Sequence, residues 1–295
     1  MPAPSGKRAL LLHNDKSRQG KDAFEMARER LEAGGLLVNA EPFENLPEIA
    51  RDIARLRQTV DAIVVCGGDG SIAASAMAVM ESGLPLGIIP AGTANDLART
   101  LELPLDFTSA AETILSGHQR KIDVGMVNGH AFFNAASIGL SSELAQKLDP
   151  DIKKRFGRFG YAIAALRILA SASRFRAQVA WKDRAISVKS YQIAIGNGRL
   201  YGGGNVVDDA AAIDDGILNL YSLEMRNLWK MALMVPAFRM GTHGSWKEVR
   251  TAESDAFTLE TRRPMPINTD GEIMTETPGH FRVLRAAVTV FAPPL

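Results

Sequence analysis

The sequence has little that could give the protein covalent cross-links or thiolate metal sites. Cys66 is the only cysteine among the 295 residues, which excludes an internal disulfide and a cluster of cysteine ligands. A single thiol fits a reducing compartment. We therefore expect a cytoplasmic protein.

The sequence also lacks an excess of charge and any long apolar run. The 34 Lys and Arg residues nearly balance the 33 Asp and Glu residues, and this net charge of +1 argues against bulk nucleic acid as the partner. No apolar run approaches the ~20 residues that span a bilayer. The apolar stretch near the N-terminus is too short for the core of a signal peptide. A hydrophobic fraction of 46% and a charged fraction of 23% are typical of a soluble globular protein.

The chain up to about residue 120 alternates strand-like and helix-like segments. Apolar runs predict strands at 8–13, 36–43, 61–66 and 84–90. Helical spacing predicts helices at 21–33, 46–58, 71–80, 95–101 and 106–117. Such alternation is typical of βαβ units, whose mostly parallel sheet is covered by helices on both faces. We assign residues 1–122 to an open α/β domain.

Antiparallel strands dominate the rest of the chain. Asn128-Gly129 between two apolar strands is a strong hairpin signal, and a second pair turns near Lys182-Asp183. Further strands are expected at 216–223, 255–261 and 281–292, and helices at 141–148, 158–172 and 227–240. We assign residues 123–295 to a mostly antiparallel β domain, a sandwich or strongly curved sheet with inserted helices. Its C-terminal tail could return to the first domain, and a cleft between the two domains would suit a ligand.

A glycine-rich turn follows the most apolar of the predicted strands. Gly67, Gly68 and Gly70 would let backbone N–H groups approach a ligand closely, and the helix that starts near Ser71 would add its positive end. These features suit a phosphate group. Asp69 would repel phosphate unless a cation such as Mg²⁺ lies between them. The simpler alternative is a strand–helix turn in which Asp69 caps the helix.

A second loop of the same type follows the next predicted strand. The backbone amides of Gly92 and Thr93, with the threonine hydroxyl, could contact a phosphate, and Asn95 and Asp96 begin a helix. In the simplest interpretation, Asn95 and Asp96 only cap that helix. Two adjacent phosphate-type loops are less expected by chance than one.

Five motifs together resemble a known family. GGDGS (67–71), PAGTANDLAR (90–99), GNGRLYGGG (196–204), DDGILNL (214–220) and NTDGE (268–272) occur in this order. This set, which spans nearly the whole chain, resembles the catalytic domain of diacylglycerol kinases, sphingosine kinases and related bacterial lipid kinases. By size, the chain is most similar to their soluble bacterial members.

The resemblance implies that ATP is bound by the loop from Gly67 to Ser71 and by Thr93. It also implies a phosphate-side motif at the N-terminus, of which Asn14 and Ser17 remain. The sequence departs from the family pattern in four places. Asp15 and Asp209 replace prolines, Ser71 replaces the commoner threonine, and residues 39–43 lack a threonine that contacts ATP in the family.

Two further clusters of acids receive roles through the resemblance. Glu272 is expected to be the general base, Asp69 to take part in catalysis, and Asp270 to assist with metal binding or orientation. From the residues alone, 268–272 is simply a hairpin turn. Asp215 and the carbonyls near Ala212 and Ile217 are expected to hold a structural cation. The alternative there is a turn with solvated acids.

The expected substrate is a lipid with a free hydroxyl, phosphorylated with ATP and Mg²⁺ during transient association with the inner face of the membrane. Basic and aromatic residues at the start of 153–175 could lie on an anionic membrane surface, and 228–246 is a second apolar segment. Both segments could equally be helices of the core. Two other functions stay open: a phosphotransferase related to NAD kinase, and a non-catalytic nucleotide-binding regulator.

Overall fold

The computed structural model describes most of the chain and divides it into two compact units. The described residues are 6–14, 18–140, 142, 173–198, 200–201, 205–206, 211–225 and 247–294. Unit 1 comprises Met1–Val124 and Leu284–Leu295, and unit 2 comprises Gly125–Val283. The predicted domain division at residue 122 stays a prediction. Several predictions fall outside the described residues: Asp15, Ser17 and Asp209, the helices at 158–172 and 227–240, and nearly all of the helix at 141–148.

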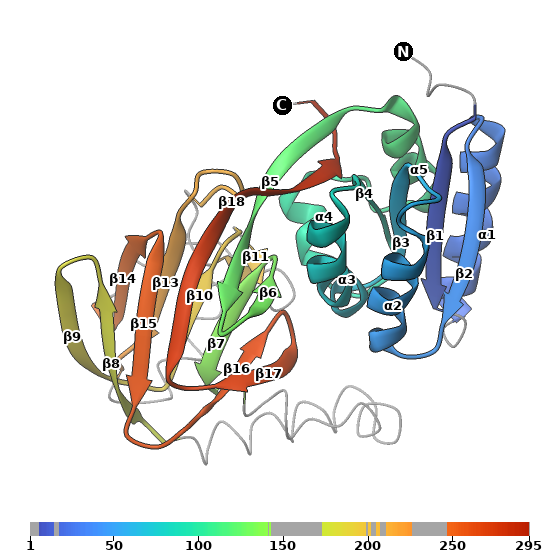
Figure 1. Cartoon of the computed structure of the whole chain (residues 1–295). Coiled ribbons are helices and arrows are strands. Elements are labelled where there is room, and N and C mark those ends of the chain that lie inside the picture. The colour runs from blue at the N-terminus through green and yellow to red at the C-terminus, as the bar shows by residue number, and fades with distance from the viewer. Residues whose placement is uncertain are drawn as a thin grey trace. The chain divides into compact units, whose positions relative to one another are not determined.

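Unit 1 is built on a parallel sheet with the strand order β2-β1-β3-β4 (Figure 1). These strands are β1 (Arg8–Asn14), β2 (Leu37–Phe43), β3 (Ala62–Gly67) and β4 (Leu86–Pro90). Every residue of β3 and β4 is buried, as expected for strands covered on both faces. The end of β18 (Gly279–Phe291) runs parallel to β4, with Val290 opposite Leu86.

Five helices accompany this sheet. They are α1 (Arg18–Ala33), α2 (Leu46–Leu56), α3 (Asp69–Ser82), α4 (Asp96–Thr100) and α5 (Phe107–Ser116). Helices α1 and α5 pack together on one face, and α2 and α3 pack together on the other (Figure 1). Leu31 of α1 and Ile114 of α5 share one apolar core with Leu11, Val64 and Cys66 of the strands. The N-terminal half thus has the predicted α/β architecture.

Unit 2 contains antiparallel strands in two main sheets. One sheet has the order β14-β13-β10-β7-β16-β17, formed by Val249–Ser254, Leu218–Leu223, Gln192–Gly196, Ala135–Gly139, Pro266–Thr269 and Glu272–Glu276. In the other sheet, the first part of β18 pairs with β15 (Ala256–Thr261). β15 pairs with β8 (Phe175–Trp181), and β8 pairs with β9 (Arg184–Ser190). β5 (Gln119–Val127) and β6 (His130–Phe132) join that sheet, and β11 (Leu200–Tyr201) pairs with β12 (Asn205–Val206).

One apolar core fills the space between the two main sheets of unit 2. It takes Ile138, Ile193 and Leu220 from one sheet and Val179 and Phe257 from the other. This packing of two antiparallel sheets confirms the predicted sandwich-like fold. Within the part of the chain that the structure describes, no helix has the length and apolarity needed to cross a bilayer.

Both hairpins predicted from the sequence are present, but one of the strands is interrupted. β5 and β6 turn at Asn128-Gly129, and β8 and β9 turn at Lys182-Asp183. The apolar segment after Asn128-Gly129 was expected to be one strand, and this was wrong: it forms β6 and then β7 in the other sheet. The chain leaves the ladder at Phe133 and Asn134 because their N–H groups bind the Asp270 carboxylate instead.

Candidate active site

Three neighbouring strands of unit 1 end side by side at the carboxyl edge of the sheet. Cys66 of β3 lies opposite His13 of β1, and Gly67 lies opposite Pro90 of β4. Asn14, the residue after His13, therefore ends its strand next to the glycine-rich turn. β1 lies between β2 and β3, so the chain passes to β2 on one side of β1 and then crosses to β3 on the other side. Open α/β sheets bind ligands at such a switch point, beyond the carboxyl ends of the strands.

The two glycine-rich loops touch through their backbones. A Cβ atom on Gly92 would lie 2.5 Å from the Cα of Gly68, and one on Gly68 would lie 3.0 Å from the Cα of Gly92. The Ala91 N–H also donates to the Gly67 carbonyl at 3.0 Å. Only residues without side chains permit so close an approach.

Asn95 holds the second loop in shape. It is the N-cap residue of α4, in the left-handed region at φ 53°, but its side chain makes no capping bond. Instead, its Oδ1 accepts from the Gly92 N–H at 2.9 Å, and its Nδ2 donates to the Gly92 carbonyl at 3.0 Å. The capping role considered for the Asn95 side chain is therefore wrong. Asp96 is the first residue of α4 and is buried.

Asp69 does not cap its own helix either. Gly68 is the N-cap of α3, with no side-chain capping bond, and Asp69 is the first helical residue. Its Oδ1 accepts from the Leu97 N–H of α4 at 3.4 Å, so this acid links the two loops. Its Oδ2 accepts no hydrogen bond from any described residue. One carboxylate oxygen therefore stays available to a cation.

The loop leaves room for a phosphate group beside that carboxylate. A Cβ on Gly70 would meet nothing within 4 Å, Gly68, Asp69 and Gly70 are half-buried, and Thr93 is exposed. Ser71 is buried against Gly67, where an added Cβ would lie 2.7 Å from the serine hydroxyl. Open space, backbone N–H groups at a helix start and a carboxylate oxygen suit a phosphate with Mg²⁺.

In unit 2, Asp270 is fixed by a row of backbone donors. Its carboxylate accepts from the N–H groups of Phe133 at 2.6 Å, Asn134 at 2.9 Å and Ala135 at 3.0 Å. The Asp270 N–H in turn donates to the Ala135 carbonyl at 3.0 Å. These bonds anchor the turn between β16 and β17 to the β6–β7 connection. The geometry suits a residue that orients its neighbours.

Glu272 begins β17 and is exposed. The turn before it is closed by the Asn268 Oδ1, which accepts from the Gly271 N–H at 3.0 Å. Asp270 occupies the left-handed region there at φ 48°. The Glu272 carboxylate thus stands exposed on a turn fixed from both sides and makes no hydrogen bond to a described side chain or backbone group. The next two residues, Ile273 and Met274, are exposed apolar side chains.

Three buried polar residues that hold strands or connections together were not selected from the sequence. Asn197 donates from its side chain to the Phe133 carbonyl at 3.0 Å, and its N–H donates to the Asn134 carbonyl at 2.8 Å. The Asn134 Oδ1 is buried and has no hydrogen-bond partner among the described residues. Asp123 of β5 is buried and accepts from the Ala286 N–H at 2.6 Å. Asn197 lies in the GNG motif at 196–198, and this motif was the one feature of the sequence that could have indicated any of the three residues.

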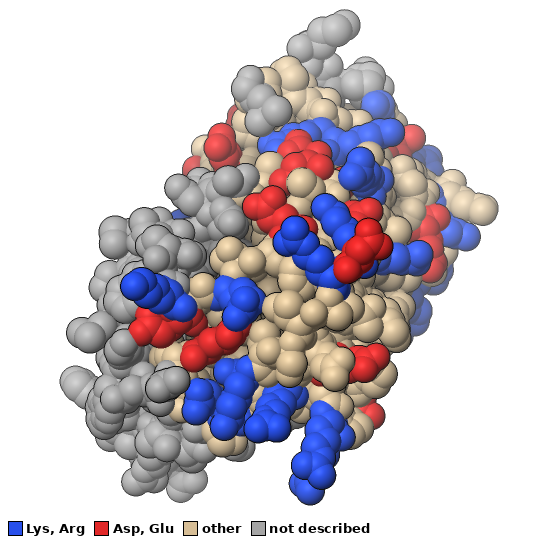
Figure 2. All heavy atoms as spheres, turned by 90° about the vertical axis from the view of Figure 1, so that its left-hand side faces the viewer, with Lys and Arg blue, Asp and Glu red and all other residues tan. Residues whose placement is uncertain are grey.

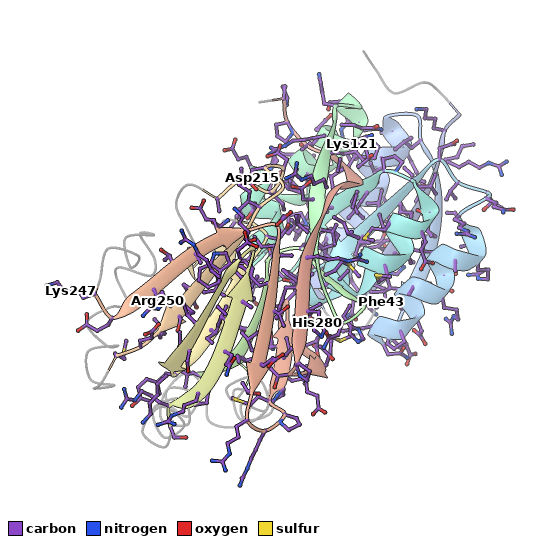
Figure 3. All side chains as sticks on the ribbon, turned by 60° about the vertical axis from the view of Figure 1, so that its left-hand side comes forward. Phe43, Lys121, Asp215, Lys247, Arg250 and His280 are labelled. Atoms are coloured by element: carbon purple, nitrogen blue, oxygen red, sulfur yellow. The ribbon has the colours of Figure 1, made fainter. Side chains whose placement is uncertain are left out.

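Asp215 lies in the loop before β13 (Figure 3). Its Oδ1 accepts from the Ile217 N–H at 2.8 Å, and its Oδ2 accepts from the Ala212 N–H at 3.2 Å. The Asp215 carboxylate thus holds its own loop in shape. This is compatible with the alternative interpretation of the segment as a turn that binds no cation. Within the described residues, no group of three acids, histidines or cysteines could hold a metal ion. A cation held by Ala212, Asp215 and Ile217 stays a prediction.

Comparison with known proteins places the chain in a family. Residues 8–127 match the family described as the diacylglycerol kinase catalytic domain, and residues 134–292 match the YegS C-terminal NAD kinase beta sandwich-like domain. The chain belongs to the diacylglycerol kinase family. The resemblance seen in the motifs is thereby confirmed, and the protein is an enzyme of the lipid kinase class.

Individual members of the diacylglycerol kinase family match along nearly the whole chain. A diacylglycerol kinase of Staphylococcus saprophyticus is 28% identical over 97% of this chain and 96% of its own length. A diacylglycerol kinase of Staphylococcus epidermidis is 26% identical over 97% of this chain and 92% of its own length. A crystal structure of a candidate diacylglycerol kinase from Bacillus anthracis superposes with a TM-score of 0.84 at 25% identity, covering 99% of this chain and 97% of the other.

Proposed function

We propose that this protein is an ATP- and Mg²⁺-dependent kinase that transfers the γ-phosphoryl group to the hydroxyl of a lipid, with diacylglycerol as the first candidate. The observation that carries the proposal is the contact between the Gly68 and Gly92 loops at the switch point of the sheet. That contact leaves a side-chain-free space beside a carboxylate. The names of the relatives support diacylglycerol in particular.

Unit 1 would bind the nucleotide. The backbone N–H groups from Gly68 to Gly70, at the start of α3, would take the phosphates, with help from Thr93 and from Asn14 at the end of β1. The Oδ2 of Asp69 would hold Mg²⁺ against them. The ion, when bound, would neutralise phosphate charge as the phosphoryl group transfers.

Unit 2 would prepare the acceptor. A lipid hydroxyl is a weak nucleophile, and the exposed Glu272 carboxylate would accept its proton as the bond to phosphorus forms. General-base assistance of this kind contributes about 10²–10⁴-fold in rate. Asp270 would position the turn through its three N–H bonds, and the exposed Ile273 and Met274 would meet the apolar part of the substrate. The protein would work in the cytoplasm, at the inner face of the membrane.

A kinase assay with defined acceptors tests this function. Purified protein with labelled ATP and Mg²⁺ should phosphorylate diacylglycerol, and chelation of the metal should abolish the product. Monoacylglycerol, phosphatidylglycerol and sphingosine are alternative lipid acceptors in the same panel. Phosphorylation of NAD with no lipid product would overturn the proposal in favour of an NAD kinase-like enzyme.

A matched pair of variants tests the role of the base and separates a kinase from a non-catalytic nucleotide-binding regulator. Glu272→Gln should lower turnover about 10²–10⁴-fold with nucleotide binding preserved. Glu276→Gln changes an equally exposed acid at the other end of β17 and should leave turnover unchanged. Equal turnover in the two variants would contradict the assignment of the base.

A further inference from the structure

A row of basic side chains crosses three neighbouring strands of unit 2. Arg176 of β8 lies directly opposite Lys189 of β9, and Thr261 of β15 lies opposite Ala177, which brings Arg262 beside Arg176. Side chains alternate along these strands. Ala177, Val179 and Val188 enter the core, so Arg176 and Lys189 stand on the outer face. Arg262, in the bend directly after β15, lines the same shallow hollow as Arg176, and all three basic residues are exposed. We call Arg176, Lys189 and Arg262 the basic row.

The cations of the basic row outnumber the acids beside them. Arg174 and Arg263 flank it, and none of these five cations forms an ion pair within the described chain. Glu260, which lines the same shallow hollow as Arg176 and Arg262, is the one acid among the hollow's residues. Figure 2 shows basic side chains gathered along the lower part of this face, where β8 begins and β15 ends in Figure 1.

This arrangement is costly to the fold by itself. Like charges directly opposite each other on neighbouring strands destabilise a sheet, as Arg176 and Lys189 do here. Basic residues on an edge strand can serve to prevent strand pairing between molecules, which would account for Lys189 on β9. It would not account for Arg176, because β8 has a strand on both sides, or for Arg262, which directly follows the inner strand β15. A partner with negative charge would account for all three.

The connection from β15 to β16 links the basic row to the turn that carries Asp270 and Glu272. The Met265 N–H donates to the Thr277 hydroxyl at 2.9 Å, and the Thr261 hydroxyl donates to the Arg263 carbonyl at 2.6 Å. The hydroxyls of Thr261 and Thr277 are also hydrogen-bonded to each other. The end of β15 is thus fastened to the end of β17. Met274, exposed at 47%, is three residues from Thr277, about 10 Å along a strand.

We propose that the outer face of β15, β8 and β9 is a docking surface for an anionic lipid bilayer, which the basic row contacts through lipid headgroups. Charge complementarity supports a negative partner. The proposed lipid substrate favours a bilayer over a nucleic acid, and the exposed Met274 lies on β17, whose end is fastened to the end of β15. Apart from Glu260, the other outward residues of these strands are small or polar, among them Ala180, Ala185 and Ser187, and suit a flat partner. Only the choice of a lipid partner rests on the proposed function.

Vesicle partition of the whole protein, without ATP, tests the docking surface. Wild-type protein should bind vesicles of equal parts phosphatidylglycerol and phosphatidylcholine, should bind pure phosphatidylcholine poorly, and should lose binding as salt rises. The triple variant Arg176→Gln, Lys189→Gln, Arg262→Gln should bind the anionic vesicles roughly a hundredfold less tightly. All three positions are exposed, so an unchanged melting temperature checks that the variant is folded.

A second triple variant is the matched control. Lys7→Gln, Lys121→Gln, Lys247→Gln removes the same charge from exposed positions outside β15, β8 and β9, and Lys247 points outward just before β14 (Figure 3). It should bind anionic vesicles like the wild type. Equal binding by the two triple variants would overturn the proposal. Tighter wild-type binding to a duplex oligonucleotide than to the vesicles, lost in the first variant, would also overturn it.

A kinase assay in neutral detergent separates this proposal from the proposed function. With a short-chain diacylglycerol dispersed in detergent, the first triple variant should turn over at the wild-type rate, because no charged surface is present. Absence of wild-type turnover there would contradict the kinase proposal and leave the partition result standing. Loss of turnover in the folded variant alone would place the basic row in the substrate site and overturn its role as a docking surface.

Discussion

Gly68 and Gly92 meet backbone to backbone, so that the first atom of any side chain on Gly92 would lie 2.5 Å from the Cα of Gly68. Two loops that follow different strands thereby form one continuous surface of backbone groups. The Asn95 side chain, bonded to both the N–H and the carbonyl of Gly92, fixes the second loop against the first. The glycines are needed here for close approach, since neither has a positive φ.

Gly92→Ala should therefore weaken both the fold and nucleotide binding. The added methyl group would also lie 2.7 Å from the Asn95 Oδ1, so the two loops would have to separate. We expect a loss of about 2 kcal/mol in the free energy of unfolding, as for overpacked sites, and a raised KM for ATP. Urea unfolding and steady-state kinetics measure the two effects. Wild-type stability in this variant would show that the contact is not close in solution.

Gly70→Ala should separate the two effects. Its Cβ would meet nothing within 4 Å of the protein, and the residue lies in the first turn of α3, where alanine is the better helix former. Stability should stay the same or rise slightly. If the open space belongs to the phosphates, affinity for ATP should fall about tenfold, or about 1.4 kcal/mol. Isothermal titration with ATP and Mg²⁺ measures this, and unchanged affinity would remove Gly70 from the nucleotide site.

Local patterns were sufficient to predict unit 1. The apolar run of β3 and the amphipathic helices around it are determined by nearby residues, and both glycine-rich loops follow predicted strands. The break between β6 and β7 could not be predicted in the same way. It depends on Asp270, which lies 136 residues from Asn134 along the chain, and nothing near Asn134 indicates that its N–H will leave the ladder. The Asn95 contact with Gly92 is local, but a residue of this type at a helix start predicts a capping bond and not the bond that forms.

Asp270→Ala should destabilise unit 2 because it leaves three N–H groups without their acceptor. The expected loss is about 3 kcal/mol in the free energy of unfolding, visible as a lower urea midpoint. Asp183→Ala is the control, since that acid is exposed in the β8–β9 turn and accepts no hydrogen bond from a described residue. A variant with wild-type stability and no turnover would instead show that Asp270 acts on the substrate or metal.

Cys66 gives a pH-dependent test at the edge of the nucleotide site. Burial raises the pKa of this thiol from its ordinary value of 9.0 to about 12, because the thiolate would lose its hydration in the core of unit 1. The folded state therefore holds the proton more tightly than the unfolded state. The resulting stabilisation is complete below pH 9.0 and is lost as the pH rises toward about 12. Cys66→Ala has no thiol, so its free energy of unfolding should lack this part of the decrease at alkaline pH.

Thiol labelling measures the same burial at neutral pH. A disulfide reagent should modify Cys66 only as fast as unit 1 opens, since the thiolate is the reactive form and the side chain is fully buried. Saturating ATP with Mg²⁺ should slow the labelling further, because Gly67, the next residue, begins the loop that would bind phosphate and ligand binding favours the closed state. Rapid labelling of the native protein would contradict the buried position of Cys66. A rate unaffected by ATP would contradict the position of the nucleotide beside β3.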